Sequence, residues 1–177
     1  MKKILLVILG LILMLTTVSC GDNGKDVAKQ DFENSMEALK KGDFSGLKMN
    51  KETVESLQMF TEGYKKMTYT INKVTESDGK VLVNVTMKYP NLAEVPAIHK
   101  EVMTQLAPSL QGKSDEEITN KSKEALKATI DEALKDSDLK YAEETFDVIY
   151  VKDGKEWKVA DQGNEAYSKA VTFNFQQ

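Results

Sequence analysis

The fold is decided by residues 77–90, Ser77-Asp-Gly-Lys-Val-Leu-Val-Asn-Val-Thr-Met-Lys-Tyr-Pro90. Every second residue from Val81 to Tyr89 is apolar, and those between are mostly polar, which predicts a β-strand with one buried face. Before it, Tyr69 and Ile71 alternate with polar residues, and Lys73 would continue that set. An Asp-Gly pair between two alternating runs predicts a tight hairpin, which Pro90 ends.

A second hairpin is predicted further along the chain. Phe146, Val148 and Tyr150 alternate along one strand, Asp153-Gly154 forms the turn, and Trp157 and Val159 face inward on the return strand. Two hairpins flanked by amphipathic helices predict an α+β fold, in which helices cover one face of an antiparallel sheet.

Four amphipathic stretches predict the helices. The first ends at Gly42, and the second begins at Asn50 as N-cap. Pro96 blurs the start of the third, and a capping box at 114–117 starts the fourth. Their apolar stripes are, in order, Ala28, Phe32, Met36 and Leu39; Val54, Leu57, Phe60 and Tyr64; Leu92, Val95, Ile98, Val102 and Leu106; Ile118, Ala125, Leu126, Ile130, Ala133 and Leu134. Residues 166–175 predict either a short helix or an added edge strand.

The amino-terminal segment has the features of a secretion signal. Lys2 and Lys3 precede an apolar run from Ile4 to Leu15, and Ser19 is a small residue suited to cleavage. The run of about 12 residues falls short of the roughly 20 that a membrane-spanning helix needs. The alternative is an uncleaved membrane anchor extended through Val18.

Cys20, the one cysteine, directly follows Ser19, and Thr17-Val18-Ser19-Cys20 resembles the lipobox of bacterial lipoproteins, with Thr17 where that family usually has leucine. The resemblance implies cleavage before Cys20, a diacylglyceryl group with palmitate-type chains on its sulfur, and a location on the extracytoplasmic face of the cell membrane. Two acyl chains hold a protein stably on a bilayer, whereas one does so only marginally.

The rest of the chain has the size of one domain and an acidic composition. Without Lys2 and Lys3 it carries 22 lysines, no arginine and 28 acidic residues, a net charge of −6. This charge argues against nucleic-acid binding. The predicted organisation is a signal peptide at 1–19, a lipidated tether at 20–29, an α+β domain at 30–163, and a tail at 164–177 that is either a helix or an edge strand.

Four segments resemble small bacterial lipoproteins of the nuclear-transport-factor-2-like superfamily. They are Phe32–Phe44, Tyr69–Pro90, Gly112–Glu117, and Val151–Val159 with its phrase Asp-Gly-Lys-Glu-Trp-Lys. The resemblance implies a cone in which a curved sheet wraps helices, with a pocket at its mouth. It implies no particular activity, because this fold carries both enzymes and binding modules.

Few residues suggest catalytic or metal chemistry. His99 is the one histidine and is expected at the surface or its boundary; Asp136-Ser137-Asp138 opens like a calcium loop but lacks the later ligands. Asp147 lies between strand residues but alternates away from the apolar face. Four aromatic residues are candidates to line a pocket, or else belong to an ordinary core: Tyr69, Tyr89, Tyr150 and Trp157.

The function that follows is a lipid-anchored, extracytoplasmic binding or interaction module without catalytic activity, cofactor or metal. Its partners would be the membrane, through the amino-terminal lipid, and an envelope protein or a small apolar ligand. One alternative is an isomerase- or hydratase-like enzyme that uses a pocket acid and a tyrosine. Another is a structural or chaperone-like factor of the envelope.

Overall fold

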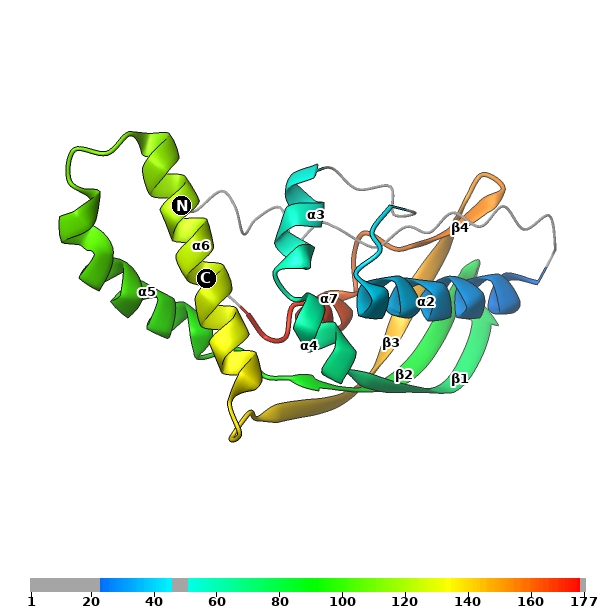
Figure 1. Ribbon diagram of the computed structural model, residues 1–177. Helices are drawn as coiled ribbons and strands as arrows, with labels where there is room; N and C mark the ends of the chain where they lie inside the picture. Colours follow the sequence, from blue (N-terminus) through cyan, green and yellow to red (C-terminus); the bar gives the residue numbers. More distant parts are fainter. Residues whose placement is uncertain (1–22, 46–50, 176–177) are drawn as a thin grey trace.

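The computed structural model describes residues 23–45 and 51–175, and these form an α+β structure (Figure 1). The elements follow in the order α2 (Gly24–Lys41), α3 (Lys51–Gln58), α4 (Thr61–Lys66), β1 (Thr68–Ser77), β2 (Lys80–Pro90), α5 (Val95–Leu106), the 3-10 turn η1 (Ala107–Leu110), α6 (Asp115–Lys135), β3 (Tyr141–Asp153), β4 (Glu156–Val159) and α7 (Glu165–Val171).

The four strands form one antiparallel sheet in the order β1-β2-β3-β4. Both predicted hairpins are confirmed, and β2 also pairs along its whole length with β3, from Lys80 opposite Val151 to Pro90 opposite Tyr141. The first hairpin turns at Asp78 and Gly79, whose φ angles of 52° and 71° are the positive values that a tight hairpin turn requires. The two hairpins are thus one continuous sheet, interrupted in sequence by α5, η1 and α6.

The prediction that Lys73 continues the inward-facing set of β1 is wrong. The register of β1 against β2 shifts between Ile71 and Lys73, so Asn72 forms a bulge. An extra residue in one strand reverses the alternation beyond it. Val74 therefore lies opposite buried Val83, while Lys73 is exposed opposite Asn84.

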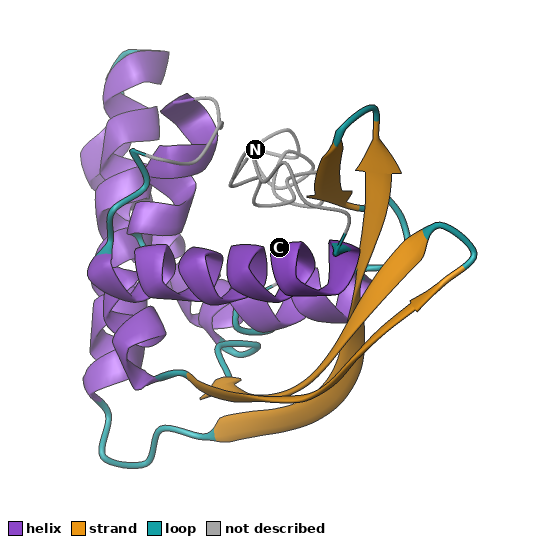
Figure 2. Cartoon of the chain, turned by 90° about the vertical axis from the view of Figure 1, so that its right-hand side faces the viewer, coloured by secondary structure: helices purple, strands orange, loops and turns teal. Residues whose placement is uncertain are grey.

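Helices pack against one face of the sheet, as predicted (Figure 2). The core lies between that face and α2, α4 and α7, and its largest fully buried side chains are Tyr64, Tyr89, Tyr150, Phe32, Phe173, Met36, Leu39, Met67, Met87, Leu92, Ile130 and Leu134. On the opposite face, Thr70, Lys88, Glu143, Thr145 and Asp147 are exposed. Within the described residues, that second face bears no helix.

The second predicted helix is two helices, because the chain turns at Met59 and Phe60. The amides of both residues donate to carbonyls three positions earlier, and the Thr61 hydroxyl donates to the Gln58 carbonyl at 2.9 Å. This turn brings Phe60 against Phe173, with ring centroids 5.7 Å apart. The aromatic contact explains why one continuous stripe gives two shorter helices. The predicted N-cap, Asn50, lies outside the described residues.

α5, η1 and α6 form a helical hairpin that extends from one end of the sheet (Figure 1). The capping box that opens α6 is confirmed, with Ser114 and Glu117 bonded reciprocally. No residue between 96 and 128 is buried, although apolar side chains recur there. The apolar stripe of α6 thus enters the core only near its end, at Ile130 and Leu134. Leu92 precedes α5 and is not part of it.

At both ends of the described chain, the structure shows where a helix begins. The tail contains a helix, α7, and not an edge strand. α2 begins at Gly24, inside the segment predicted as a tether, and Gly24, Val27 and Ala28 are buried. Cys20 lies outside the described residues, so its lipidation stays a prediction. None of the helices in the described ranges combines the length and apolar character of a membrane span.

Candidate functional site

α2 places two polar side chains inside the domain. Asp31 is 4% exposed and Ser35 is 1% exposed, and they lie on the same face of the helix as Ala28 and Leu39. Residues four apart on a helix share a face, so both side chains are directed to the interior by the periodicity that buries the apolar residues. A carboxyl group is rarely buried to this extent, which makes Asp31 a candidate functional residue.

Tyr150 on β3 is the hydrogen-bond partner of Asp31. Its hydroxyl donates to Oδ2 of Asp31 at 3.0 Å, and the tyrosine itself is 1% exposed. Burial raises the pKa of Asp31 from its ordinary value of 3.8 to about 7, and the Tyr150 bond opposes this rise. Burial also raises the pKa of Tyr150, and the neighbouring charge of Asp31 adds to the effect.

Tyr167 and the aromatic rings that contact it lie near this pair. Tyr167 on α7 is buried, and its pKa is raised first by burial and then by the charge of Asp31. The ring of Phe32 meets Tyr69 edge to face at 5.2 Å between centroids and lies 6.0 Å from Tyr167; Phe146 lies 6.5 Å from Tyr167. This apolar environment disfavours the charged form of the carboxyl group and strengthens every hydrogen bond made there.

β4 contacts the start of the same helix. A Cβ atom placed on Gly24 would lie 2.5 Å from Cζ2 of Trp157, which is closer than any real contact of that kind. Glycine at this position therefore lets the indole ring lie directly on the backbone of α2. The contact joins the short strand β4 to the helix that carries Asp31.

The four candidate pocket residues do not form one group. Tyr150 contacts Asp31, Tyr69 contacts Phe32, and Trp157 contacts Gly24, so three of them lie against α2. Tyr89 is fully buried elsewhere and donates to Oε1 of Glu144 at 2.9 Å. Whether any of them lines an open pocket stays a prediction.

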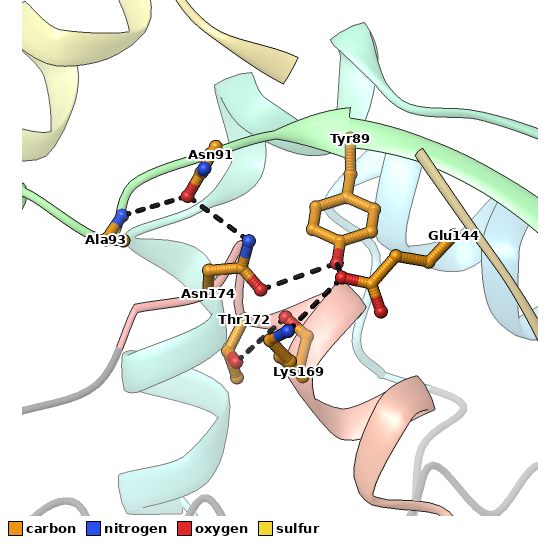
Figure 3. A network of polar contacts seen from close by, with 7 residues as sticks. All are labelled: Tyr89, Asn91, Ala93, Glu144, Lys169, Thr172 and Asn174. Atoms are coloured by element: carbon orange, nitrogen blue, oxygen red, sulfur yellow. Dashed lines mark hydrogen bonds and ion pairs between the residues drawn. The ribbon is translucent and has the colours of Figure 1, made fainter. Parts of the chain in front are cut away.

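Tyr89 belongs to a polar network that attaches Lys169 and Asn174 to the sheet (Figure 3). Glu144 also pairs with Lys169 of α7 at 3.2 Å, and Tyr89 reaches Asn174 at 3.4 Å. Asn174 in turn donates to Asn91 at 3.2 Å. Each group in this network has a protein partner, so the network accounts for the docking of α7 and its following residues on β2 and β3.

The other candidates from the sequence lie at the surface or near it. Asp147 is exposed on the uncovered sheet face and accepts from Asn84 at 2.7 Å, as its alternation predicts. Asp136 accepts from the amide of Asp138 at 2.9 Å, the arrangement of an ordinary turn. His99 is half-buried on α5, and burial lowers its pKa.

Sequence reasoning passed over Asp31, the most unusual acid in the described chain. Its neighbours Ala28, Phe32 and Met36 define the apolar stripe, and Asp31 and Ser35 lie at one border of it. The available signal was their position: a helix packed on a curved sheet buries a wide stripe, which includes the residues three and seven after Ala28. Tyr150, by contrast, was selected, although its partner was not.

No family model matches the chain. No curated protein matches it either. The crystal structure of a "putative lipoprotein (ycdA)" from Bacillus subtilis subsp. subtilis str. 168 is similar to it, with 20% identity, a TM-score of 0.44 and 80% of this chain covered. This chain spans 46% of that protein.

Proposed function

We propose that the protein is a lipid-anchored, extracytoplasmic module without catalytic activity, which binds an envelope protein or a small apolar ligand. The observation that carries the proposal is the burial of the acid–tyrosine pair. Asp31 and Tyr150 are 4% and 1% exposed and hydrogen-bonded to each other. A general acid or base must come within hydrogen-bond reach of the group it serves. In this arrangement the pair is buried and closed to a substrate.

The sequence before the domain supports the location. Cys20 follows a secretion-type leader, and α2 begins four positions later at Gly24. Four residues span at most about 14 Å, so a lipid on Cys20 would keep the domain close to the bilayer surface. The curvature of the sheet around α2 and α7 (Figure 2) supports the cone form that we propose for the domain.

The experiment is a search for turnover with two matched variants. Asp31→Asn and Tyr150→Phe each remove one reactive group with little change of shape, and Asp147→Asn changes an exposed acid as control. We expect that double-bond isomerisation and hydration substrates are not converted by the purified full-length protein. Turnover that falls at least 100-fold in Asp31→Asn, with an unchanged circular dichroism spectrum and normal turnover in Asp147→Asn, would contradict the proposal.

One observation favours the enzyme as second candidate. Asp31 has a pKa of about 7 and contacts a tyrosine hydroxyl, and a carboxyl group with such a pKa exchanges protons efficiently near neutrality. Catalysis would then require a movement of α2 or β4 that opens the site to substrate. In that case Asp31→Asn and Tyr150→Phe would both lose activity, and the rate would follow the titration of one group near pH 7.

A further inference from the structure

Two atoms on α2, Oδ1 of Asp31 and Oγ of Ser35, are buried and have no hydrogen-bond partner among the described residues. Buried polar atoms in folded proteins are nearly always paired with protein groups or ordered water. Tyr150 donates to the other carboxylate oxygen, Oδ2, so Oδ1 remains free to accept. Because the two residues lie four apart on one helix, a single additional hydrogen-bonding group can reach both atoms.

Ser35 differs from three buried hydroxyl groups, those of Ser56 on α3, Thr129 on α6 and Thr172 directly after α7. Ser56, Thr129 and Thr172 donate to the carbonyls four positions earlier, at 2.8–2.9 Å. That bond satisfies a helical hydroxyl without any outside group. Ser35 has the same option through the Asp31 carbonyl and does not use it, so its proton is available to a different acceptor.

The two residues lie four positions apart on α2, about one helical turn. Residues four apart on a helix have Cβ atoms about 5–6 Å apart. A water molecule whose two hydrogen bonds of about 2.8 Å meet at a tetrahedral angle joins oxygen atoms about 4.5 Å apart, a separation that side chains on successive turns of a helix can reach. A water molecule needs two to four polar partners to be held inside a protein, and the two atoms provide the minimum.

We propose that Asp31 and Ser35 bind a single buried water molecule, which donates to Oδ1 of Asp31 and accepts from the hydroxyl of Ser35. The titratable groups that face Asp31 from the packed elements are Tyr150 on β3 and Tyr167 on α7, and both are neutral near pH 7. A water that donates to the carboxylate stabilises its charged form. Proton binding by Asp31 is therefore coupled to this water.

The test follows the carboxyl carbon of Asp31 by NMR through a pH titration of the full-length protein. Ser35→Ala removes one partner of the water, whereas Ser56→Ala is the matched control, because the Ser56 hydroxyl is already bonded to Glu52 at 2.9 Å. We expect Ser35→Ala to raise the titration midpoint of Asp31 by about half a pH unit or more. Ser56→Ala should leave it unchanged. Equal midpoints in Ser35→Ala and in the unchanged protein would overturn the proposal.

A second measurement does not depend on any variant. A high-resolution crystal structure of the unchanged protein should show one spherical density peak within hydrogen-bond distance of Oδ1 of Asp31 and Oγ of Ser35. Continuous density for a larger co-purified molecule would overturn the assignment to water. Direct contact between the two side chains, with no density between them, would overturn it as well.

Discussion

Asp31 is charged above a pH of about 7 in the folded protein, whereas an unfolded chain ionises the same residue near 3.8. Because burial penalises the carboxylate, the folded state holds its proton more tightly than the unfolded state. The favourable contribution is complete below pH 3.8 and is lost as pH rises through 7. A shift of this size corresponds to about 4 kcal/mol of unfolding free energy at alkaline pH.

Asp31→Asn should remove this dependence, since the amide keeps the shape of the side chain and does not ionise. We expect the variant to gain stability relative to the unchanged protein between pH 4 and 8, by up to about 4 kcal/mol. Urea unfolding at a series of pH values measures this difference. Asp147→Asn, which removes a carboxyl group from the exposed sheet face, is the control. A constant difference for Asp31→Asn would show that the buried carboxyl titrates normally.

Gly24 is the second residue with a sharp consequence, because Trp157 lies directly on its backbone. Gly24→Ala would place a methyl group inside the contact distance and should destabilise the protein by about 1–3 kcal/mol. Alanine ordinarily favours a helix over glycine, so a loss would go against helix propensity. The same change in a Trp157→Leu background should cost less. Equal costs in both backgrounds, measured by urea unfolding, would rule out the contact as the cause.

Among the elements, the strands and helices with strict periodicity could be predicted from the sequence. β2 buries every second residue from Val81 to Tyr89, and the Asp78-Gly79 turn allows little other than a hairpin. Local chemistry was also sufficient for the capping box at Ser114. In each case the decisive interactions lie within a few residues of sequence.

What could not be predicted depends on contacts between distant segments. The break between α3 and α4 depends on Phe60 packing against Phe173. The bulge at Asn72 is defined only by pairing with β2. The same holds for the candidate site, because Asp31 and Tyr150 are 119 residues apart and only the packing of α2 on β3 brings them together. Tyr150 could be identified as inward-facing, but its partner could not.

The helical hairpin gives a prediction at the same scale. Ser114→Ala removes the cap of α6, which ordinarily costs about 0.5–2 kcal/mol. Since no residue from 96 to 128 is buried, we expect this loss to appear as local opening, not as global unfolding. Hydrogen exchange of amides 115–120 should become faster, while the urea midpoint stays constant. Thr119→Ala, at an exposed position, is the control. A large fall in the urea midpoint would show that the hairpin unfolds together with the core.

For the whole molecule, the principal prediction concerns Cys20. Cys20→Ala removes the only cysteine thiol of the chain, so lipid cannot be attached there. We expect the protein to leave the membrane fraction or to keep its uncut leader. Fractionation of cells, with mass spectrometry of the amino-terminal peptide, distinguishes these outcomes. A variant that is still membrane-bound and normally processed would contradict lipid anchoring, and Ser45→Ala is a neutral control.

The early start of α2 also has a consequence for orientation. Three residues separate Cys20 from Gly24, so a lipid on Cys20 would hold the domain close to the bilayer and restrict its rotation. The end of the molecule that contains β4, where Trp157 lies on Gly24, would then face the lipid headgroups. α5 and α6 lie at the opposite end of the molecule (Figure 1) and would point away from the membrane. Anything arriving from beyond the membrane would encounter those helices first.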